Sequence, residues 1–327
     1  MSNFTITIVG TGVIGTSLAL ALKQTEDPPR LIGHDKDVSI ASKAAKLGAF
    51  DKADWNLINA CEPADLIILA MPLNGVRFTL EAIGPYLKPN AVVTDTCVSK
   101  QAVLAWATEL LPEHVHFVGG NPIGQTTGVC SENARADLFK GRRYCLTPAS
   151  SAHEDAVQLL TGLVSLLGAE PFFLDPAEHD GLITAVEHLP AALSVALVRA
   201  LSQQKPWRET QKLAGGSFER TSAAASGDPD GLAEAFAQNR PVLLHWLDQY
   251  LAELQNLRAL LAAESDSNEA LAQHIDAAVV ARLNWLKEYQ TGGFIDPELV
   301  SQKVEIPGFF ERLIGFGGRR KRQGDDK

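Results

Sequence analysis

The chain has 327 residues, a formal net charge of −10 at pH 7, 46% hydrophobic residues and 21% charged residues. This hydrophobic fraction excludes a disordered chain, and the ordinary glycine and proline content excludes collagen-like and low-complexity classes. The acidic balance argues against nucleic acid as a partner, since phosphate affinity depends on clustered Lys and Arg. We therefore expect a globular protein of about two domains.

The cysteines and the N-terminus bear on the compartment. The four cysteines have neither CxxC spacing nor a paired-histidine pattern, so we expect no disulfide framework and no metal site. The N-terminus has no signal-peptide pattern. The longest apolar stretch, 181–201, contains Glu187, His188, Pro190 and Arg199, which a bilayer would penalise. We expect a cytoplasmic protein with no membrane partner, in which this stretch is a buried helix.

From residue 4 to about 175, short β-branched runs alternate with Ala- and Leu-rich helical stretches. This alternation predicts an α/β fold built on a parallel sheet with crossover helices. The predicted strands are Thr5–Val9, Leu31–His34, Leu66–Ala70, Ala91–Thr94, His116–Val118, Arg143–Leu146 and Pro171–Leu174.

After residue 175 the pattern predicts only helices, at 176–203, 207–216, 230–262 and 269–290. In the third, a broad apolar face is formed by Leu243, Trp246, Leu247, Tyr250, Leu251, Leu254 and Leu257. The helix that covers this face comes either from a second copy, in a homodimer, or from the same chain. The domains that we predict are 1–175, 176–292 and an appended tail, 293–327.

The first predicted strand leads into Gly10-Thr11-Gly12-Val13-Ile14-Gly15 and then a helix, a context in which GxGxxG predicts a dinucleotide site. The first glycine permits the tight turn, the second lets the backbone approach the pyrophosphate, and the third allows close packing of helix and strand. The helix N-terminus attracts the phosphates. We therefore predict a Rossmann-type domain in which all six residues contact the cofactor.

The residues after the next strands indicate which cofactor binds. Asp35 follows the second strand, where a carboxylate accepts from the ribose 2′-hydroxyl and repels a 2′-phosphate, so we predict NAD rather than NADP. Asp37 is a rival for this contact. Met71 and Pro72 end a buried strand at the edge of the sheet where ligands bind, and we expect both to contact the cofactor.

Two further loops, Asp95–Cys97 and Gly119–Pro122, are expected at the same edge, where they form the floor of the active site. Their positions follow from the strands that precede them.

Motifs in a consistent order then run to about residue 260. They include Val9–Gly15, Ala64–Leu73, Val93–Asp95 with Lys100, Phe117–Gly120 with Pro122, Leu138–Gly141, His179-Asp180, His188–Pro190, Gly215–Phe218, Ala225–Pro229 and Asn239-Arg240. In these motifs the chain resembles the prephenate/arogenate dehydrogenase family of tyrosine biosynthesis. The resemblance implies a Rossmann-type domain followed by an all-helical dimerisation domain, with a small-molecule substrate held between them. It also implies NAD(P)-dependent oxidative decarboxylation, in which a hydride leaves the carbon bearing the ring hydroxyl and loss of carbon dioxide makes the ring aromatic.

The sequence departs from the family pattern at residues that this chemistry uses. Asn121 stands where the family has the histidine that bonds the ring hydroxyl; an amide cannot take up the hydroxyl proton but can orient the hydroxyl. Cys97 replaces a serine, and Ala191 replaces the second histidine of a His-Leu-Pro-His motif. Ala223 replaces the arginine expected to bind a substrate carboxylate.

The catalytic candidates that remain are Asn121, His188 and Glu187. His188 is the best acid–base candidate because imidazole titrates near neutrality, and a buried core role is an equal alternative. Glu187 would add negative charge, which disfavours a dianionic substrate and raises the pKa of a neighbouring histidine. We expect His179 and Asp180 to hold the start of the helix at 176–203.

For substrate binding we expect Ser99, Lys100 and Arg220. Arg220 lies three residues before Ala223, so in a helix the two share a face and Arg220 can replace the missing cation. The alternative is a surface arginine paired with Glu219 or water.

Three functions remain open at this point. The chain is an NAD-dependent dehydrogenase of the prephenate/arogenate type, a dehydrogenase of the same fold that acts on a less anionic hydroxylated substrate, or a non-catalytic NAD-binding regulatory protein.

Overall fold

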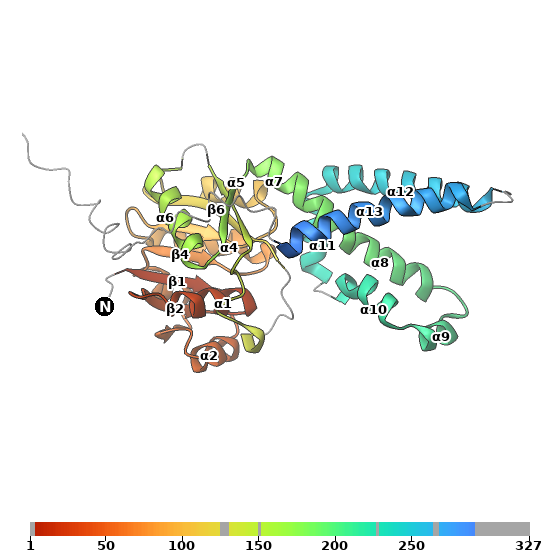
Figure 1. Ribbon diagram of the computed structural model, residues 1–327. Coiled ribbons are helices and arrows are strands. Elements are labelled where there is room, and N and C mark those ends of the chain that lie inside the picture. The colour runs from red at the N-terminus through yellow and green to blue at the C-terminus, as the bar shows by residue number, and fades with distance from the viewer. Residues whose placement is uncertain (1–3, 125–130, 150–151, 227–228, 264–267, 292–327) are drawn as a thin grey trace, which may run out of the picture. The chain divides into compact units, whose positions relative to one another are not determined.

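A computed structural model describes residues 4–124, 131–149, 152–226, 229–263 and 268–291 (Figure 1). The chain divides into two compact units, the first running to Asp180 and the second beginning at Gly181. This division falls inside helix α7 (Pro176–Ile183), slightly beyond the predicted boundary at 175/176. The predicted tail, 293–327, lies outside the described residues.

The first unit is built on an eight-stranded sheet with the strand order β3-β2-β1-β4-β5-β6-β7-β8. The strands are β1 (Thr5–Val9), β2 (Arg30–His34), β3 (Lys52–Ala53), β4 (Leu66–Leu69), β5 (Val92–Asp95), β6 (His116–Pro122), β7 (Arg143–Pro148) and β8 (Glu170–Phe173). All seven predicted strands are present. The two residues of β3 are too few to produce a sequence pattern, and this edge strand was not predicted.

Helices cover both faces of this sheet (Figure 1). In β4, Leu66 and Ile68 pack into one apolar cluster with α1 (Val13–Leu22) and α6 (Glu154–Leu166), whereas Ile67 and Leu69 pack into another with α4 (Leu73–Ile83) and α5 (Gln101–Leu110). A sheet buried on both faces requires continuous hydrophobic strands, which is the pattern that the sequence shows. The remaining helices of this unit are α2 (Val38–Lys46) and α3 (Leu57–Cys61), with short 3-10 turns at Gly84–Tyr86 and Ser131–Asn133.

The pairing of β6 with β7 corrects the predicted architecture. The pairs from β3 to β6 and the β7–β8 pair are parallel, but β6 and β7 are antiparallel, with Asn121 opposite Cys145. We predicted a loop at Gly119–Pro122, and the structure continues β6 through these residues. The two glycines make this possible, because a Cβ at Gly119 would lie 2.3 Å from a Thr147 hydroxyl and one at Gly120 would lie 2.6 Å from a backbone oxygen. Asn121 is therefore held in a strand.

The described residues of the second unit form helices joined by turns, with no strand among them, as predicted. After α7 come a π-helical turn, η3 (Thr184–His188), then α8 (Leu189–Ser202), α9 (Trp207–Thr210), η4 (Gln211–Leu213), α10 (Gly216–Ser222), η5 (Ala223–Ser226), α11 (Pro229–Gln238), α12 (Arg240–Ala262) and α13 (Glu269–Thr291).

The long apolar helix is less buried than we predicted. Among the described residues, Pro176–Ser202 is long and apolar enough to cross a membrane, and 28% of its most apolar window is buried. Within the second unit α8 packs against α10, η5 and α12, and the buried residues of α8 are Ala191 and Ser194. Val186, in the turn before α8, is 65% exposed in the single chain.

Candidate functional site

The glycine turn after β1 has the geometry that its sequence predicts. Gly10 has φ +97°, a left-handed conformation that favours glycine, and a Cβ there would lie 2.1 Å from the Ala70 carbonyl oxygen. A Cβ at Gly15 would lie 1.9 Å from the Gly10 carbonyl oxygen and 3.0 Å from the Ile8 side chain. The absence of both side chains lets α1 begin close against the turn and β1.

The start of α1 is suited to an anionic group. Gly12 is its N-cap, and within the described residues no side chain caps this end. Val13 and Ile14 begin the helix, so their backbone N–H groups belong to the first turn, where the helix itself supplies no acceptor. The arrangement fits the pyrophosphate of a dinucleotide.

Asp35 is tied to the glycine turn as well as placed at the end of β2. Its Oδ2 accepts from the backbone N–H of Thr11 at 2.8 Å and from the Thr11 hydroxyl at 3.2 Å, while Oδ1 accepts from the Asp37 N–H at 3.0 Å. A carboxylate offers about four lone-pair positions, so Oδ1 can accept a further bond. The ribose contact stays a prediction. The rival Asp37 caps α2 by accepting from Ser39 N–H, and hydrogen bonds to Ser39 lower the pKa of Asp37.

The chain leaves the sheet after β4 as predicted. Met71 is half-buried, and Pro72 is exposed and forms the N-cap of α4. The Cys97 thiol lies 3.5 Å from the Met71 carbonyl oxygen. Burial raises the pKa of this thiol well above its ordinary value, so the sulfur stays protonated at neutral pH and is unsuited to act as a nucleophile.

A fully buried ion pair between Lys100 and Asp95 forms hydrogen bonds to the backbone of Gly120, the residue before Asn121. The Lys100 ammonium donates to the Asp95 carboxylate and, at 2.6 Å, to the Gly120 carbonyl oxygen. Asp95 in turn accepts from Gly120 N–H at 3.1 Å and from Cys97 N–H at 2.9 Å. Two of the three ammonium donors therefore bond to protein groups, which favours a structural role for Lys100 over the substrate contact that we predicted. The predicted substrate residue Ser99 is also fully buried.

The sequence carried a signal for this pair that we did not use. A lysine among apolar residues needs a carboxylate partner, because an unpaired buried charge is strongly destabilising. Asp95 lies five residues before Lys100 in the chain. Sequence reasoning had placed Asp95 only in the floor of the site.

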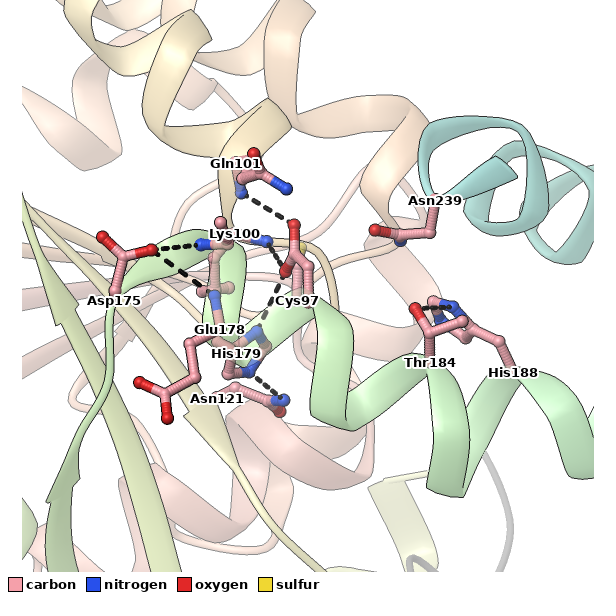
Figure 2. Close-up of polar contacts among 12 residues, drawn as sticks. Cys97, Lys100, Gln101, Asn121, Asp175, Glu178, His179, Thr184, His188 and Asn239 are labelled. Atoms are coloured by element: carbon pink, nitrogen blue, oxygen red, sulfur yellow. Dashed lines mark hydrogen bonds and ion pairs between the residues drawn. The ribbon is translucent and has the colours of Figure 1, made fainter. Parts of the chain in front are cut away.

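His179 and Asp180 form a second buried network, which ends at Asn121 (Figure 2). Asp180 accepts from the backbone N–H groups of Lys100 at 2.7 Å and Gln101 at 3.0 Å, at the start of α5. His179 Nδ1 lies 3.0 Å from the Asp180 carboxylate, and its Nε2 lies 3.0 Å from Asn121 Nδ2.

The predicted role of this pair was therefore wrong in one respect. We expected His179 and Asp180 to hold the start of the helix at 176–203, but Asp180 holds the start of α5. The start of α7 is held by Asp175, whose Oδ1 accepts from Ala177 N–H at 2.8 Å. Sequence spacing could not reveal this, because Asp180 acts on residues about 80 positions away.

These groups share one edge of the first unit. Strands β1, β4, β5 and β6 run parallel, so their carboxyl ends lie together. That edge carries the glycine turn, Met71, Asp95 and Asn121. In open α/β sheets ligands bind outside the carboxyl ends of the strands, which makes this edge the candidate active site.

In the second unit, His188 lies at the end of the π-helical turn η3. Pro190 explains the turn, because a proline ring within a helix clashes with the carbonyl four residues earlier and the extra residue relieves the clash. His188 is buried, with Nδ1 3.5 Å from the Thr184 hydroxyl and its ring edge-on to Phe236 at 6.3 Å. Such turns occur frequently at functional sites.

The other two predicted residues of this unit are exposed. Partial desolvation raises the pKa of the Glu187 carboxyl. The side chain is nevertheless exposed, so water screens much of its interaction with other charges. Arg220 lies in α10, and helical backbone continues through Ala223, so the two residues share a face as predicted.

Comparison with known proteins decides the family. The profile of the prephenate dehydrogenase nucleotide-binding domain matches residues 18–172, and that of the prephenate dehydrogenase dimerization domain matches residues 175–277. The chain belongs to the prephenate dehydrogenase family. It is thus an oxidoreductase with a nucleotide-binding domain of Rossmann type followed by a helical domain, and the predicted family and fold class are confirmed.

Relatives within the family support the same assignment. The chain is 28% identical to prephenate dehydrogenase of Bacillus subtilis over 95% of this chain and 80% of that one. It is 26% identical to cyclohexadienyl dehydrogenase of Zymomonas mobilis over 85% and 94%, respectively. Among solved structures, Synechocystis arogenate dehydrogenase matches with a TM-score of 0.67, 28% identity and coverage of 89% of this chain and 100% of that one. Prephenate dehydrogenase from A. aeolicus, solved with hydroxyphenyl propionate and NAD+, shares the fold with a TM-score of 0.77, 24% identity and coverage of 88% and 99%.

Proposed function

We propose that this protein is an NAD-dependent dehydrogenase of tyrosine biosynthesis that oxidises and decarboxylates a cyclohexadienol, either prephenate or arogenate. The observation that carries the proposal is the start of α1 behind the glycine turn, which no described side chain caps, in a chain that both domain profiles of the prephenate dehydrogenase family match. NAD, when bound, supplies the acceptor for the hydride. Asp35 favours it over NADP, because its carboxylate would repel a 2′-phosphate.

The balance of the reaction explains why Asn121 can replace a histidine. The ring carbon that bears the hydroxyl loses a hydride, the bond to the departing carboxylate breaks, and its electron pair completes the aromatic ring. The product phenol keeps a hydroxyl proton, so no net removal of a proton is required. What the site must supply is an acceptor that stabilises the positive charge growing on the hydroxyl as the hydride leaves. An amide oxygen does this without titrating.

The substrate that we favour is arogenate. Prephenate and arogenate carry the same two carboxylates, but the ammonium of arogenate lowers its net negative charge. The absence of a cation at Ala223 and the carboxylate of Glu187, which can pair with that ammonium, both favour the less anionic of the two substrates. We propose that Arg220 binds the side-chain carboxylate and that His188 orients the substrate. This choice lies between the first two functions that the sequence leaves open, because arogenate is a family substrate of lower negative charge than prephenate.

We further propose that the protein works as a cytoplasmic homodimer. The second unit matches a dimerization domain, and its helices α12 and α13 expose large apolar side chains in the single chain: Leu244, Tyr250, Leu251, Leu254, Leu261, Ile275, Val279, Val280, Leu283, Trp285 and Tyr289. Of the face predicted on α12, Leu243 is buried within the chain, whereas Tyr250, Leu251 and Leu254 are exposed. A second copy is the partner that would cover them.

The test is a direct assay with the purified protein, NAD and each cyclohexadienol, following the absorbance of reduced cofactor. We expect turnover of both substrates, with kcat/KM for arogenate about tenfold above that for prephenate, a difference of about 1.4 kcal/mol in transition-state binding. The Asn121→Ala variant should lose at least about tenfold in kcat while retaining NAD binding.

Two outcomes would replace the proposal. Calorimetric binding of NAD with no oxidation of either substrate would favour a regulatory NAD-binding protein. Oxidation of other hydroxylated acids, but not of these two, would favour a different substrate for the same fold.

A further inference from the structure

The side chain of Asn121 contacts a series of buried polar groups that take no part in the proposed reaction. The side chains of Asn121, His179 and Asp180 are 3%, 0% and 2% exposed. They follow one another at 3.0 Å, from Asn121 Nδ2 to His179 Nε2 and from His179 Nδ1 to the Asp180 carboxylate (Figure 2). Buried side chains in such a series must match donor to acceptor at each contact.

The direction of each hydrogen bond follows from Asp180. An ionised carboxylate only accepts, so His179 Nδ1 carries the proton and donates to it. Asp180 also accepts two backbone N–H groups at the start of the ten-residue helix α5, which stabilises its charge without an imidazolium. Asn121 turns its NH2 group, which can only donate, towards Nε2 of His179 at 3.0 Å, so Nε2 is the acceptor of this contact.

The backbone on the other side of Asn121 is fixed as well. Lys100 and Asp95 bond to the carbonyl and N–H of Gly120, the residue before Asn121 in β6. With the strand held and the amide nitrogen committed to His179, rotation of the amide is suppressed. The oxygen Oδ1 is then the acceptor that Asn121 can offer to a ligand.

We propose that His179, anchored by Asp180, is a positioning residue that fixes the Asn121 amide so that its oxygen accepts the hydrogen bond of the substrate hydroxyl. The proposal rests on the proposed function for the identity of that hydroxyl. It makes the site selective for substrates that present a hydrogen-bond donor at the carbon that loses the hydride. A ketone or a methyl ether at this carbon has no hydrogen to donate. Its oxygen would face a lone pair of Asn121 Oδ1, so such a compound should bind poorly.

The first test reads the tautomer of His179 without any substrate. The protein is labelled with ¹⁵N-histidine, and the His179 signals among its eight histidines are assigned by their loss in His179→Gln. We expect a protonated Nδ1 and an unprotonated Nε2 at neutral pH. A proton on Nε2, in the other tautomer or in an imidazolium, would overturn the proposal, since Asn121 would then present its oxygen to His179.

The second test separates positioning from a purely structural role. His179→Phe keeps a planar ring but removes the acceptor, so we expect kcat to fall by about 10- to 100-fold while the Kd for NAD changes less than about twofold. His179→Gln should recover part of kcat, because its amide oxygen can accept from Asn121. His114→Phe, at an exposed histidine of the same unit, is the matched control and should leave kcat unchanged. Undiminished kcat in His179→Phe would refute the role.

The third test uses the pH profile. In Asn121→Asp the ionised carboxylate cannot donate to Nε2, so the contact can form only when a proton is added to His179 or to the new carboxyl group. We expect kcat of this variant to rise as the pH is lowered from about 8 to about 6, unlike that of the unaltered protein. Identical pH profiles would contradict the proposal. If the unaltered protein oxidises neither substrate, the proposed function fails, and the tautomer measurement still decides the hydrogen-bond direction.

Discussion

At the scale of single residues, the glycines of the first turn are the positions where one added methyl group has a defined effect. A Cβ at Gly15 would overlap the Gly10 carbonyl oxygen at 1.9 Å, so backbone would have to move at the point where a dinucleotide binds. Gly181, in α7, has open space around the position of a Cβ and lies within a helix. The two positions therefore separate a steric effect from helix propensity.

We predict that Gly15→Ala destabilises the protein by about 1–3 kcal/mol and weakens NAD binding at least about tenfold. Gly181→Ala should instead stabilise it by about 0.5–1 kcal/mol, because alanine loses less backbone entropy in a helix. Urea unfolding and calorimetric titration with NAD measure the two effects. Equal NAD affinity in the two variants would be inconsistent with the close approach of α1 to the turn.

His116 gives the stability of the protein a dependence on pH. Burial, with a smaller contribution from the neighbouring His153 ring at 5.3 Å between centroids, lowers the pKa of His116 below its ordinary value of 6.5. The unfolded chain therefore binds a proton more readily than the folded protein does. The free energy of unfolding falls as the pH drops through about 6.5, and it levels off below the folded-state pKa.

The matching prediction is that His116→Asn flattens the decrease in stability between about pH 7 and pH 5. Urea unfolding at a series of pH values measures the slope, and His114→Asn at the exposed neighbouring histidine serves as the control. A slope that persists unchanged in His116→Asn would assign the pH dependence to other groups.

At the scale of elements, the π-helical turn at Thr184–His188 places His188. Without the ring of Pro190, the segment can return to regular α-helical hydrogen bonding, which turns the residues on one side of the former bulge by about 100°. The ring of His188 would then leave its place beside Thr184 and Phe236.

We predict that Pro190→Ala raises the free energy of unfolding by about 1 kcal/mol, through better helix propensity, while lowering kcat at least about tenfold. Thermal unfolding and the cyclohexadienol assay give the two values. Retention of full kcat in a variant that has lost the bulge would show that the position of His188 does not matter for turnover.

The elements also show what the sequence could predict. The strands of the sheet were found because they are buried on both faces, so their hydrophobic runs are continuous. The extension of β6 through Asn121 was missed because it depends on pairing with β7, and the partner of Asn121, His179, lies 58 residues away. The charges of Lys100 and Asp95 suggest that these two side chains pair. Which backbone groups the pair then contacts depends on how the strands pack and cannot be predicted from charge alone.

At the scale of the whole molecule, the exposed apolar side chains of α12 and α13 predict the state of assembly. A leucine buried on association contributes about 1.5–3 kcal/mol, and in a symmetric dimer each substitution acts twice. Leu251 and Leu254, which are 53% and 44% exposed in the single chain, are therefore sensitive positions.

We predict that Leu251→Glu with Leu254→Glu weakens dimer formation by about 1,000-fold or more and yields monomers at micromolar concentration. Sedimentation equilibrium measures this, with Phe78→Glu as the control, since Phe78 is 72% exposed in the first unit and should leave the assembly unchanged. A dimer of the double variant with unaltered affinity would place the interface elsewhere.

The contact between Asn121 and His179 limits which residues can replace the family's histidine at position 121. An asparagine amide and a histidine ring both carry an N–H group that can donate to Nε2 of His179. One can therefore replace the other at position 121 while His179 and Asp180 stay unchanged. Leucine and an ionised aspartate have no side-chain N–H group and cannot donate to Nε2. Replacements that lack such a group should therefore arise in homologues only together with a change at the histidine.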